Sequence, residues 1–290
     1  MEFVTFLRDG IQLPGLLTAD RQRVLSLEEA GLGAWSTLTA FIADAGPDLL
    51  ARAASASAQS EGTPLSSVQL LAPIPKPCHD ILCVGVNYRD HLEESEAAMG
   101  KIAHQDSVYF SKRAHIMTPH DATIDGHLDL DPCLDYEVEL AVVIGRECRN
   151  VAPEEAEDYI FGYSVFNDMS ARGIQMRHNQ WYRGKSLDGF AIMGPTLVHK
   201  SALPFPIEVD VCSRVNGELR QSSNTRLFLA DIPHLISELS HGITLEPGDI
   251  IATGTPAGVG MGFDPPRWLK SGDTVECEIQ GVGLLRTHIR

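Results

Sequence analysis

Three acidic residues stand beside strongly apolar segments of the sequence. Glu137 and Glu139 are two residues apart in DYEVELAVVIG (135–145), and in a β-strand this spacing puts both carboxylates on one face. Asp168 directly follows a second apolar segment, YIFGYSVFN (159–167). Carboxylates that lie close together repel each other and lose hydration on burial, and a bound cation relieves both costs. Oxygen ligands with no His or Cys nearby favour Mg²⁺, with Mn²⁺ or Ca²⁺ as substitutes.

The two glutamates have a second interpretation. Charged side chains two residues apart are common on the solvated face of an edge strand. The pair alone does not distinguish a metal site from such a face, so the decision rests on the other motifs of the chain.

His91 and Glu94 form a second candidate pair, in NYRDHLEES (87–95). Their spacing of three residues puts them on one face of a helix. A carboxylate bonded to one imidazole nitrogen orients the ring and raises its basicity, which leaves the other nitrogen to accept a proton. Glu93 is adjacent and could be the partner instead. A surface His–Glu ion pair is the alternative without catalytic meaning.

Strands must position these residues, because β-like segments dominate from residue 81 onwards and do not alternate regularly with helices. We predict a β-rich α+β fold, a mixed roll or barrel-like sandwich with a few peripheral helices. Hairpin turns are expected at Asp9-Gly10 and Asn216-Gly217. The proline-rich segment LLAPIPKPCHD (70–80) has the character of a linker. It separates a small N-terminal domain, 1–70, from a larger catalytic domain, 71–290.

The glycine-rich segment GTPAGVGMG (254–262) follows a predicted strand and resembles a nucleotide-binding loop. The residues that follow it, FDPPRW, cannot begin a long helix, and no lysine stands at a P-loop position. A nucleotide site is therefore not expected.

Composition restricts the partners and the compartment. The 290 residues carry a net charge of −16, with 23 basic and 39 acidic side chains, and such a surface repels nucleic acid and anionic membranes. A small anionic substrate would need a locally positive site. The six cysteines include no C-x-x-C pair, so their spacing predicts neither a zinc site nor a disulfide framework. No apolar run approaches the roughly 20 residues of a membrane span, and the N-terminus lacks a signal-peptide pattern, so a cytoplasmic protein is expected.

Five motifs occur in one order: VGVNYRDHLEES, DYEVELAVVIG, FGYSVFNDMSARGIQ, RGKSLDGFAIMGP and IIATGTPAGVG. Together, over residues 81–262, they resemble the fumarylacetoacetate hydrolase family. The resemblance implies a mixed β-roll, a homodimer, and Mg²⁺ held by Glu137, Glu139 and Asp168.

The resemblance also implies roles for individual side chains. It assigns the activation of water to His91 with Glu94, and puts Lys185, flanked by small residues, where it can stabilise an oxyanion. An ordinary loop lysine is the alternative for Lys185. Four further residues are candidates for substrate contacts, although Arg172 could equally hold a structural carboxylate and the last two could be merely structural: Arg172, Gln175, Tyr88 and Thr255. Three positions depart from the family's frequent residues and leave the shape of the pocket open: Met169, Gly173 and Leu187.

These parts predict a Mg²⁺-dependent hydrolase that cleaves a C–C bond in an acylpyruvate or related β-diketo acid. The alternative on the same site is decarboxylation of an oxaloacetate-like acid or isomerisation of a hydroxymuconate-like acid. A catalytically silent metal-binding dimer is a more distant alternative, disfavoured because His91, Glu94 and Lys185 occur together.

Overall fold

The computed structural model describes residues 1–59, 61–99 and 106–290. Its largest sheet runs in the order β4-β3-β2-β1-β13-β11-β10-β16-β6-β7, and β5 also pairs with β1. The strands of this sheet are β1 (Glu2–Arg8), β2 (Ile11–Leu17), β3 (Arg23–Ser26), β4 (Thr63–Pro64), β5 (Gln69–Leu71), β6 (Ile81–Gly85), β7 (Val108–Lys112), β10 (Val138–Ile144), β11 (Ile160–Asp168), β13 (Ala191–His199) and β16 (Ile250–Ala252).

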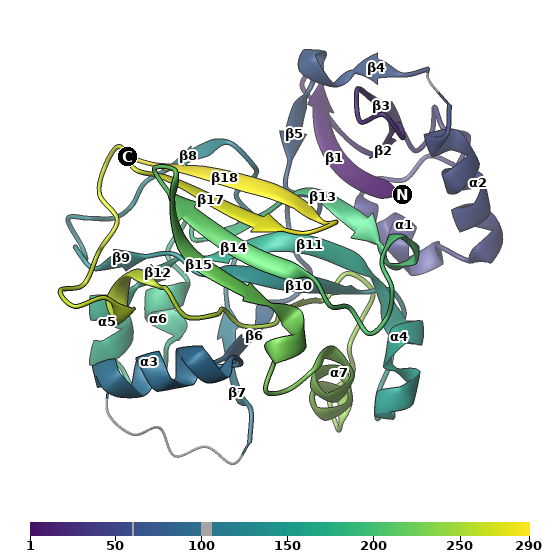
Figure 1. Ribbon diagram of the computed structural model, residues 1–290. Coiled ribbons are helices and arrows are strands. Elements are labelled where there is room, and N and C mark those ends of the chain that lie inside the picture. Colours follow the sequence, from purple (N-terminus) through teal and green to yellow (C-terminus); the bar gives the residue numbers. More distant parts are fainter. Residues whose placement is uncertain (60, 100–105) are drawn as a thin grey trace.

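A five-stranded sheet packs across the middle of the large one, as Figure 1 shows. Its order is β15-β14-β17-β18-β8, from β8 (Ala122–Ile124), β14 (Asp210–Val215), β15 (Glu218–Asn224), β17 (Thr274–Ile279) and β18 (Gly283–Ile289). A two-stranded sheet joins β9 (Leu134–Asp135) to β12 (Ser170–Ala171). The sheets form an open sandwich, and the predicted β-rich α+β fold is confirmed.

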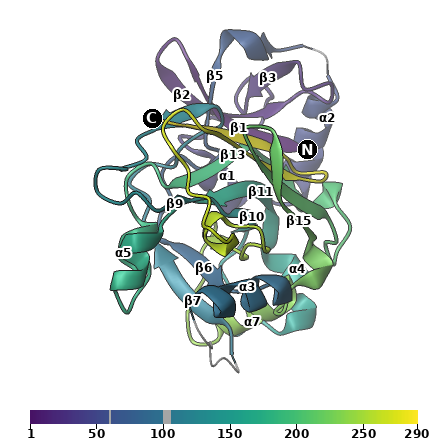
Figure 2. The ribbon, with the colours of Figure 1, turned by 60° about the vertical axis from the view of Figure 1, so that its left-hand side comes forward.

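The helices lie outside the sheets (Figures 1 and 2). They are α1 (Leu38–Asp44), α2 (Pro47–Ser57), α3 (Arg89–Met99), α4 (Ala156–Tyr159), α5 (Arg172–Arg177), α6 (Tyr182–Lys185) and α7 (Ile232–Ser240). Short 3-10 turns are η1 (Leu65–Ser67), η2 (Pro153–Glu155), η3 (Lys200–Ala202), η4 (Thr225–Leu227) and η5 (Gly260–Gly262). No helix among the described residues is long and apolar enough to cross a membrane.

Strand β10 shows why the core forms where it does. Val138, Leu140 and Val142 belong to the core shared with the five-stranded sheet, while Ala141 and Val143 belong to the core that α1 helps to cover. Both faces of the strand are therefore apolar, as is usual for a central strand covered on both sides. Glu139 is the one charged residue within it.

The N-terminal strands continue the large sheet. β1 pairs with β13 in antiparallel register, with Phe3 opposite Leu197. The two-residue turn at Asp9-Gly10 joins β1 to β2, and both turn residues have the positive φ that a type I′ turn requires. In both views these strands and α3 lie at opposite ends of the molecule (Figures 1 and 2).

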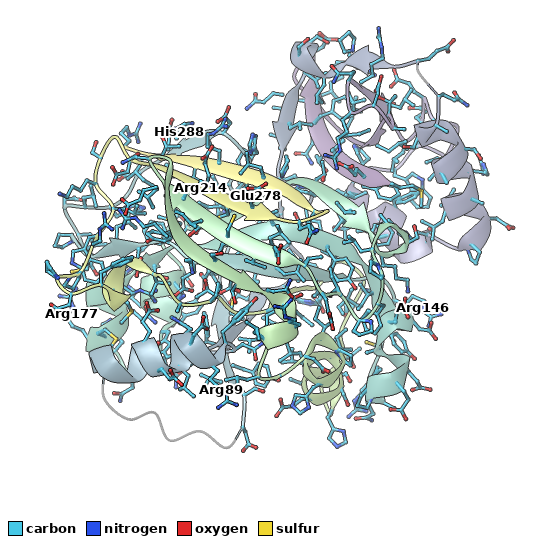
Figure 3. The ribbon with its side chains drawn as sticks, in the orientation of Figure 1. Arg89, Arg146, Arg177, Arg214, Glu278 and His288 are labelled. Atoms are coloured by element: carbon cyan, nitrogen blue, oxygen red, sulfur yellow. The ribbon has the colours of Figure 1, made fainter. Side chains whose placement is uncertain are left out.

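The outer face of the five-stranded sheet is polar, in keeping with the two-residue periodicity of its strands. Arg214 on β14 and Glu278 on β17 form an ion pair of 2.9 Å across neighbouring strands, and His288 stands on β18 (Figure 3). The predicted turn at Asn216-Gly217 joins β14 to β15. Only the inner face of this sheet contributes to the core.

Candidate active site

The sheet register brings the three predicted metal ligands together. β10 begins beside the end of β11, Val138 lies opposite Asn167, and the Asp168 amide donates to the Glu137 carbonyl at 2.9 Å. One carboxylate oxygen from each of Glu137, Glu139 and Asp168 lies within 4.8 Å of the others, and all three residues are buried. The interpretation as a solvated edge strand is wrong, because β10 lies between β11 and β16.

Two buried lysines neutralise part of this acidic cluster. The Lys185 ammonium lies 2.6 Å from Glu137 Oε2 and 2.7 Å from Asp168 Oδ2. Burial opposes its positive charge, but the charges of Asp168 and Glu137 outweigh burial and raise the pKa of Lys185. Lys112, at the end of β7, lies 2.5 Å from Asp168 Oδ1 and donates to the Met169 carbonyl at 2.8 Å. Lys112 is not among the residues predicted from the motifs, although a lysine that ends the apolar segment SVYFSK is a signal for it.

Glu139 differs from the other two members of the cluster, which are paired directly with lysines. Among the residues that the structure describes, its carboxylate has no ion-pair partner, and Oε2 accepts from the Gly254 amide at 2.9 Å. Burial, then the charges of Asp168 and Glu137, raise the pKa of Glu139 well above its usual range. A buried carboxylate beside two others, with oxygen donors alone, fits a hard divalent cation such as Mg²⁺ or Mn²⁺.

Arg172 holds carboxylates of the protein itself. Its Nε lies 2.9 Å from Asp135 Oδ2, its second terminal nitrogen lies 2.6 Å from Glu137 Oε1, and Nη1 donates to Gln175 Oε1 at 3.0 Å. Burial works against ionisation of Glu137, but the charges of Lys185 and Arg172 outweigh it and hold the pKa of Glu137 far below its usual range. Of the two roles considered for Arg172, the structural one is present, and the side chain also lines the cavity.

The predicted dyad forms, and Glu94 is its acidic member. His91 Nδ1 lies 2.9 Å from Glu94 Oε2, both side chains come from α3, and Glu93 is exposed. Glu94 Oε1 accepts from the Gly258 amide at 3.0 Å. The carboxylate is therefore fixed from two sides, and Nε2 of His91 has no hydrogen-bond partner among the residues that the structure describes.

A small cavity joins His91 of the dyad to Glu137 and Glu139 of the acidic cluster. Its polar lining includes His91, Ser95, Glu137, Glu139, Arg172, Gln175, Lys185 and Thr255, and its apolar lining includes Phe110, Trp181 and Met261. The Thr255 hydroxyl donates to the Val138 carbonyl at 2.9 Å and accepts from Gln221 at 2.7 Å. Tyr88 lies outside this lining and packs on Phe228 with ring centroids 4.9 Å apart.

The glycine-rich segment 254–262 binds acidic side chains of the protein, which the sequence analysis did not foresee. The Gly254 amide donates to Glu139 and the Gly258 amide to Glu94. The amides of Gly260 and Met261 donate to the two oxygens of Asp135 at 2.6 and 3.1 Å. One loop therefore holds Glu139 of the acidic cluster, Glu94 of the dyad and the Asp135 carboxylate that bonds to Arg172.

The three departures from the family pattern have structural explanations. Met169 and Leu187 are buried in the core and lie outside the cavity lining. A Cβ at position 173 would lie 2.6 Å from Asp131 Oδ1, so the Asp131 carboxylate fills the space beside Gly173. That carboxylate accepts from the Ile174 amide at 2.5 Å, near the start of α5.

Comparisons with known proteins agree with this geometry. The model of the fumarylacetoacetate (FAA) hydrolase C-terminal domain matches residues 80–290. The chain belongs to the fumarylacetoacetate hydrolase family. It is thus an enzyme of that family, and the resemblance read from the five motifs is confirmed.

Three relatives show the range of this family. Oxaloacetate tautomerase YisK of Bacillus subtilis is 48% identical over 227 residues, which is 78% of this chain and 74% of that protein. A fumarylacetoacetate hydrolase from psychrophilic Exiguobacterium antarcticum is 37% identical, with a TM-score of 0.81 over 100% of this chain and 99% of that one. Maleylpyruvate hydrolase from Sphingobium sp. SYK-6, solved with manganese and pyruvate, is 29% identical, with a TM-score of 0.79 over 100% and 98%.

Proposed function

We propose that the protein catalyses the keto–enol tautomerisation of a small 2-oxo dicarboxylic acid of the oxaloacetate class. One observation carries the proposal: His91, whose ring is bonded to Glu94, lines the same cavity as Glu137 and Glu139. Tautomerisation requires one group that removes a proton beside a carbonyl and returns it to the carbonyl oxygen. The 48% identity to an oxaloacetate tautomerase supports this reaction.

Glu137, Glu139 and Asp168 would hold the divalent cation. When bound, Mg²⁺ or Mn²⁺ supplies Lewis-acid stabilisation of the negative charge that develops on the 2-oxygen. Glu94 holds the Nδ1 side of His91, so Nε2 removes a proton from C3 of the keto acid. The resulting imidazolium returns that proton to the 2-oxygen, which gives the enol and restores the neutral base.

The remaining cavity residues suit a small dianion. The Lys185 ammonium lines the cavity and offsets negative charge near the acidic cluster, and the Gln175 amide nitrogen stays available because Oε1 is bonded to Arg172.

Hydrolysis of an acylpyruvate, the function predicted from the sequence, is the second candidate. The same dyad can take a proton from a water molecule, which then attacks the distal carbonyl. The likeness to maleylpyruvate hydrolase over the whole chain favours this candidate.

One experiment separates these reactions. The Mg²⁺-loaded enzyme is mixed with enol oxaloacetate, keto oxaloacetate and a set of acylpyruvates, and the enol absorbance, CO₂ and free pyruvate are followed. The tautomerase proposal predicts rapid loss of the enol absorbance without CO₂. Cleavage of an acylpyruvate at a much higher kcat/KM would favour hydrolysis, and CO₂ release at the same rate as enol loss would favour decarboxylation. An enol signal that decays as slowly as in buffer contradicts the tautomerase proposal.

A further inference from the structure

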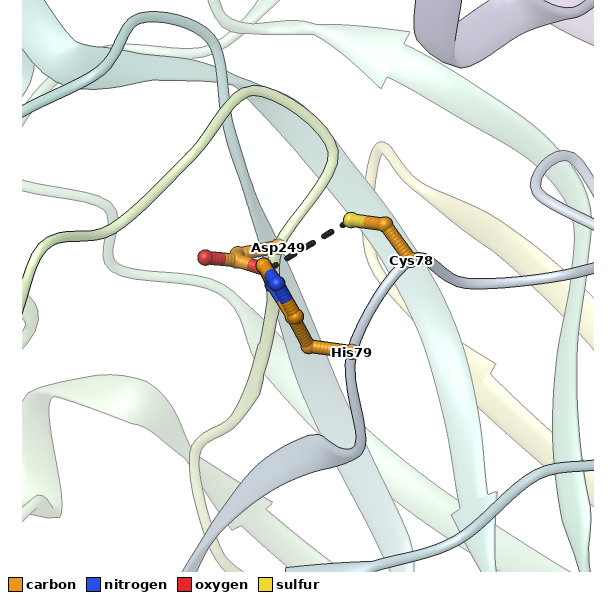
Figure 4. Close-up of side chains that lie close together, drawn as sticks. All are labelled: Cys78, His79 and Asp249. Atoms are coloured by element: carbon orange, nitrogen blue, oxygen red, sulfur yellow. Dashed lines mark hydrogen bonds and ion pairs between the residues drawn. The ribbon is translucent and has the colours of Figure 1, made fainter.

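Away from the cavity, three side chains of different chemistry converge at the other end of two sheet strands. Figure 4 shows Cys78 and His79, from the segment before β6, meeting Asp249, which directly precedes β16. One donor atom from each lies within 4.8 Å of the others. We propose that the Cys78–His79–Asp249 cluster is a second metal site, which takes Zn²⁺ or a similar thiophilic divalent cation.

The donor set distinguishes this cluster from the carboxylate cluster. A thiolate, an imidazole and a carboxylate are the ligands that Zn²⁺ binds in proteins, whereas Mg²⁺ prefers oxygen alone. Three protein ligands leave the fourth tetrahedral position for water. Cys78 and His79 are exposed, so an ion can reach them and keep that water.

The distances are close to those of a tetrahedral site. His79 Nδ1 lies 2.7 Å from Asp249 Oδ1, and Cys78 Sγ lies 3.7 Å from the same oxygen. Ligands at normal zinc bond lengths lie about 3.3–3.6 Å apart, so the His–Asp pair must open by about half an ångström. On binding, the Cys78 thiol gives its proton to solvent and sulfur binds the ion as the thiolate.

The framework around the cluster is already fixed. Asp249 is buried, and its second oxygen accepts from the Glu246 amide at 2.7 Å, which leaves Oδ1 for the ion. β6 and β16 are parallel neighbours, with Ile251 opposite Leu82, so the residues before them enter the sheet side by side. The cysteine spacing could not predict this site, because Asp249 is 170 positions from His79.

The position of the cluster gives such an ion a structural role. At their opposite ends the same two strands lead to the active site: Val84 and Gly85 line the cavity, and Gly254, which follows β16, holds Glu139. An ion at the cluster would fasten the linker and the starts of both strands together. It would stabilise the fold by an amount that grows with the logarithm of the zinc concentration relative to Kd.

The test uses the full-length protein with its carboxylate site saturated by Mg²⁺, titrated with Co²⁺ and then Zn²⁺. We expect a thiolate-to-cobalt charge-transfer band, one zinc per chain after dialysis, and a zinc-dependent rise in Tm. Cys78→Ser should abolish the band, and His79→Ala should weaken zinc binding by at least about tenfold, with no loss of fold because both side chains are exposed.

Cys212→Ser is the matched control, since Cys212 is a partly exposed cysteine outside the cluster. It should keep both the cobalt band and the zinc stoichiometry. The proposal is overturned if the wild-type protein gives no thiolate band, if the band persists in Cys78→Ser, or if zinc binds only by displacing the ion at Glu137, Glu139 and Asp168.

Discussion

At the scale of single residues, the orientation of His91, the base of the proposed reaction, depends on which of two adjacent glutamates bonds to its ring. The sequence leaves both Glu93 and Glu94 open as the partner of His91, because the two glutamates are adjacent. In the structure Glu94 bonds to His91 and to the Gly258 amide, while Glu93 is exposed. A carboxylate fixed from both sides holds the imidazole in one orientation, which is what a proton-transfer step requires.

The first prediction concerns this dyad. His91→Ala should slow tautomerisation, and any acylpyruvate cleavage, by a factor of about 10²–10⁴, the usual contribution of a general base. Glu94→Gln should act in the same direction and by less, because the imidazole remains but is misoriented. Glu93→Gln is the matched control and should keep the wild-type rate. Any oxaloacetate decarboxylation should fall much less in His91→Ala, because loss of CO₂ relies mainly on the cation as electron sink.

Steady-state rates with Mg²⁺, measured on oxaloacetate and on an acylpyruvate, test the dyad. Wild-type turnover of every substrate by His91→Ala would end the general-base role. Equal effects of Glu93→Gln and Glu94→Gln would show that the contact at 2.9 Å is irrelevant to catalysis.

The second prediction concerns the acidic cluster and contrasts two of its members. EDTA should abolish activity, and Mg²⁺ or Mn²⁺ should restore it. Glu139→Gln should weaken metal binding at least about tenfold. It should leave the apo protein as stable as the wild type or more stable, because it removes a buried carboxylate that has no ion-pair partner among the described residues. Glu137→Gln should instead destabilise the apo protein by about 3 kcal/mol, because Lys185 and Arg172 each lose one of their two carboxylate partners and both are buried.

Urea unfolding without metal and titration with Mn²⁺ provide the two readouts. Full turnover in metal-free enzyme would contradict the metal site. If the Glu139→Gln apo protein is as unstable as the Glu137→Gln one, the contrast between a paired Glu137 and an unpaired Glu139 is wrong.

At the scale of elements, the glycine loop 254–262 connects α3 to the acidic cluster. Gly262 gives the loop its close approach, because a Cβ there would lie within bonding distance of the Glu94 carboxylate. The third prediction is that Gly262→Ala displaces Glu94 and slows turnover about as much as Glu94→Gln does. Gly46→Ala is the matched control, since a Cβ at Gly46 meets nothing within 4 Å.

A double-mutant cycle shows whether the effect passes through Glu94. In a Glu94→Ala background, Gly262→Ala should change the rate little, because the carboxylate that it displaces is already absent. Additive losses would mean that the methyl group acts on the loop in some other way, and the positioning role would be wrong.

The elements themselves could largely be predicted from sequence, whereas their long-range pairings could not. The apolar run in 138–144 and the Asn216-Gly217 turn are local signals, and both features are present. The local pattern of the glycine loop resembles that of a phosphate-binding loop. Its glycines show that the backbone can approach a ligand closely, but they do not show which ligand. Its ligands are Glu94, Asp135 and Glu139, which come from residues more than 100 positions away.

At the scale of the whole molecule, the N-terminal unit is attached to the catalytic sheet. The sequence suggested a separate domain, 1–70, and the boundary near residue 70 stays a prediction. β1 pairs with both β13 and β5, so the large sheet runs through both parts. Composition carries no signal for such pairing, because the pairing depends on which strand edges meet after folding.

The fourth prediction is that the protein is a homodimer. Three exposed leucines lie on or after β15, the edge strand of the five-stranded sheet: Leu219, Leu227 and Leu229. Exposed apolar side chains at a sheet edge favour association with a second copy. Light scattering at micromolar concentration should give twice the chain mass. The double variant Leu219→Lys, Leu227→Lys should shift the measured mass toward that of a single chain. Ile11→Lys, at an exposed residue of β2, is the control and should remain dimeric, while a monomeric wild-type protein contradicts the prediction.

The last prediction concerns the junction between β1 and β13, where His199 is buried at the end of β13. Its amide donates to the Met1 carbonyl at 2.9 Å, and its Nδ1 accepts from the Ser201 amide at 3.2 Å. Burial, the N-terminal charge and Lys200 lower the pKa of His199 to about 4. Above pH 6.5 the side chain is neutral in both the folded and the unfolded chain. Between pH 6.5 and 4 only the unfolded chain takes up the proton, so stability falls as the pH falls.

The loss in the free energy of unfolding should approach about 2–3 kcal/mol at pH 4, after allowance for partial solvent screening. His199→Asn keeps an acceptor for the Ser201 amide but cannot titrate, so its stability should fall less between pH 7.5 and pH 4.5 than that of the wild type. Urea unfolding midpoints of both proteins across this range measure the difference, and His115→Asn, at an exposed histidine, controls for the loss of an imidazole elsewhere. If the wild-type and His199→Asn curves run parallel, protonation of His199 does not couple to folding, and acid loosens the molecule at some place other than the junction of the N-terminal strands with the catalytic sheet.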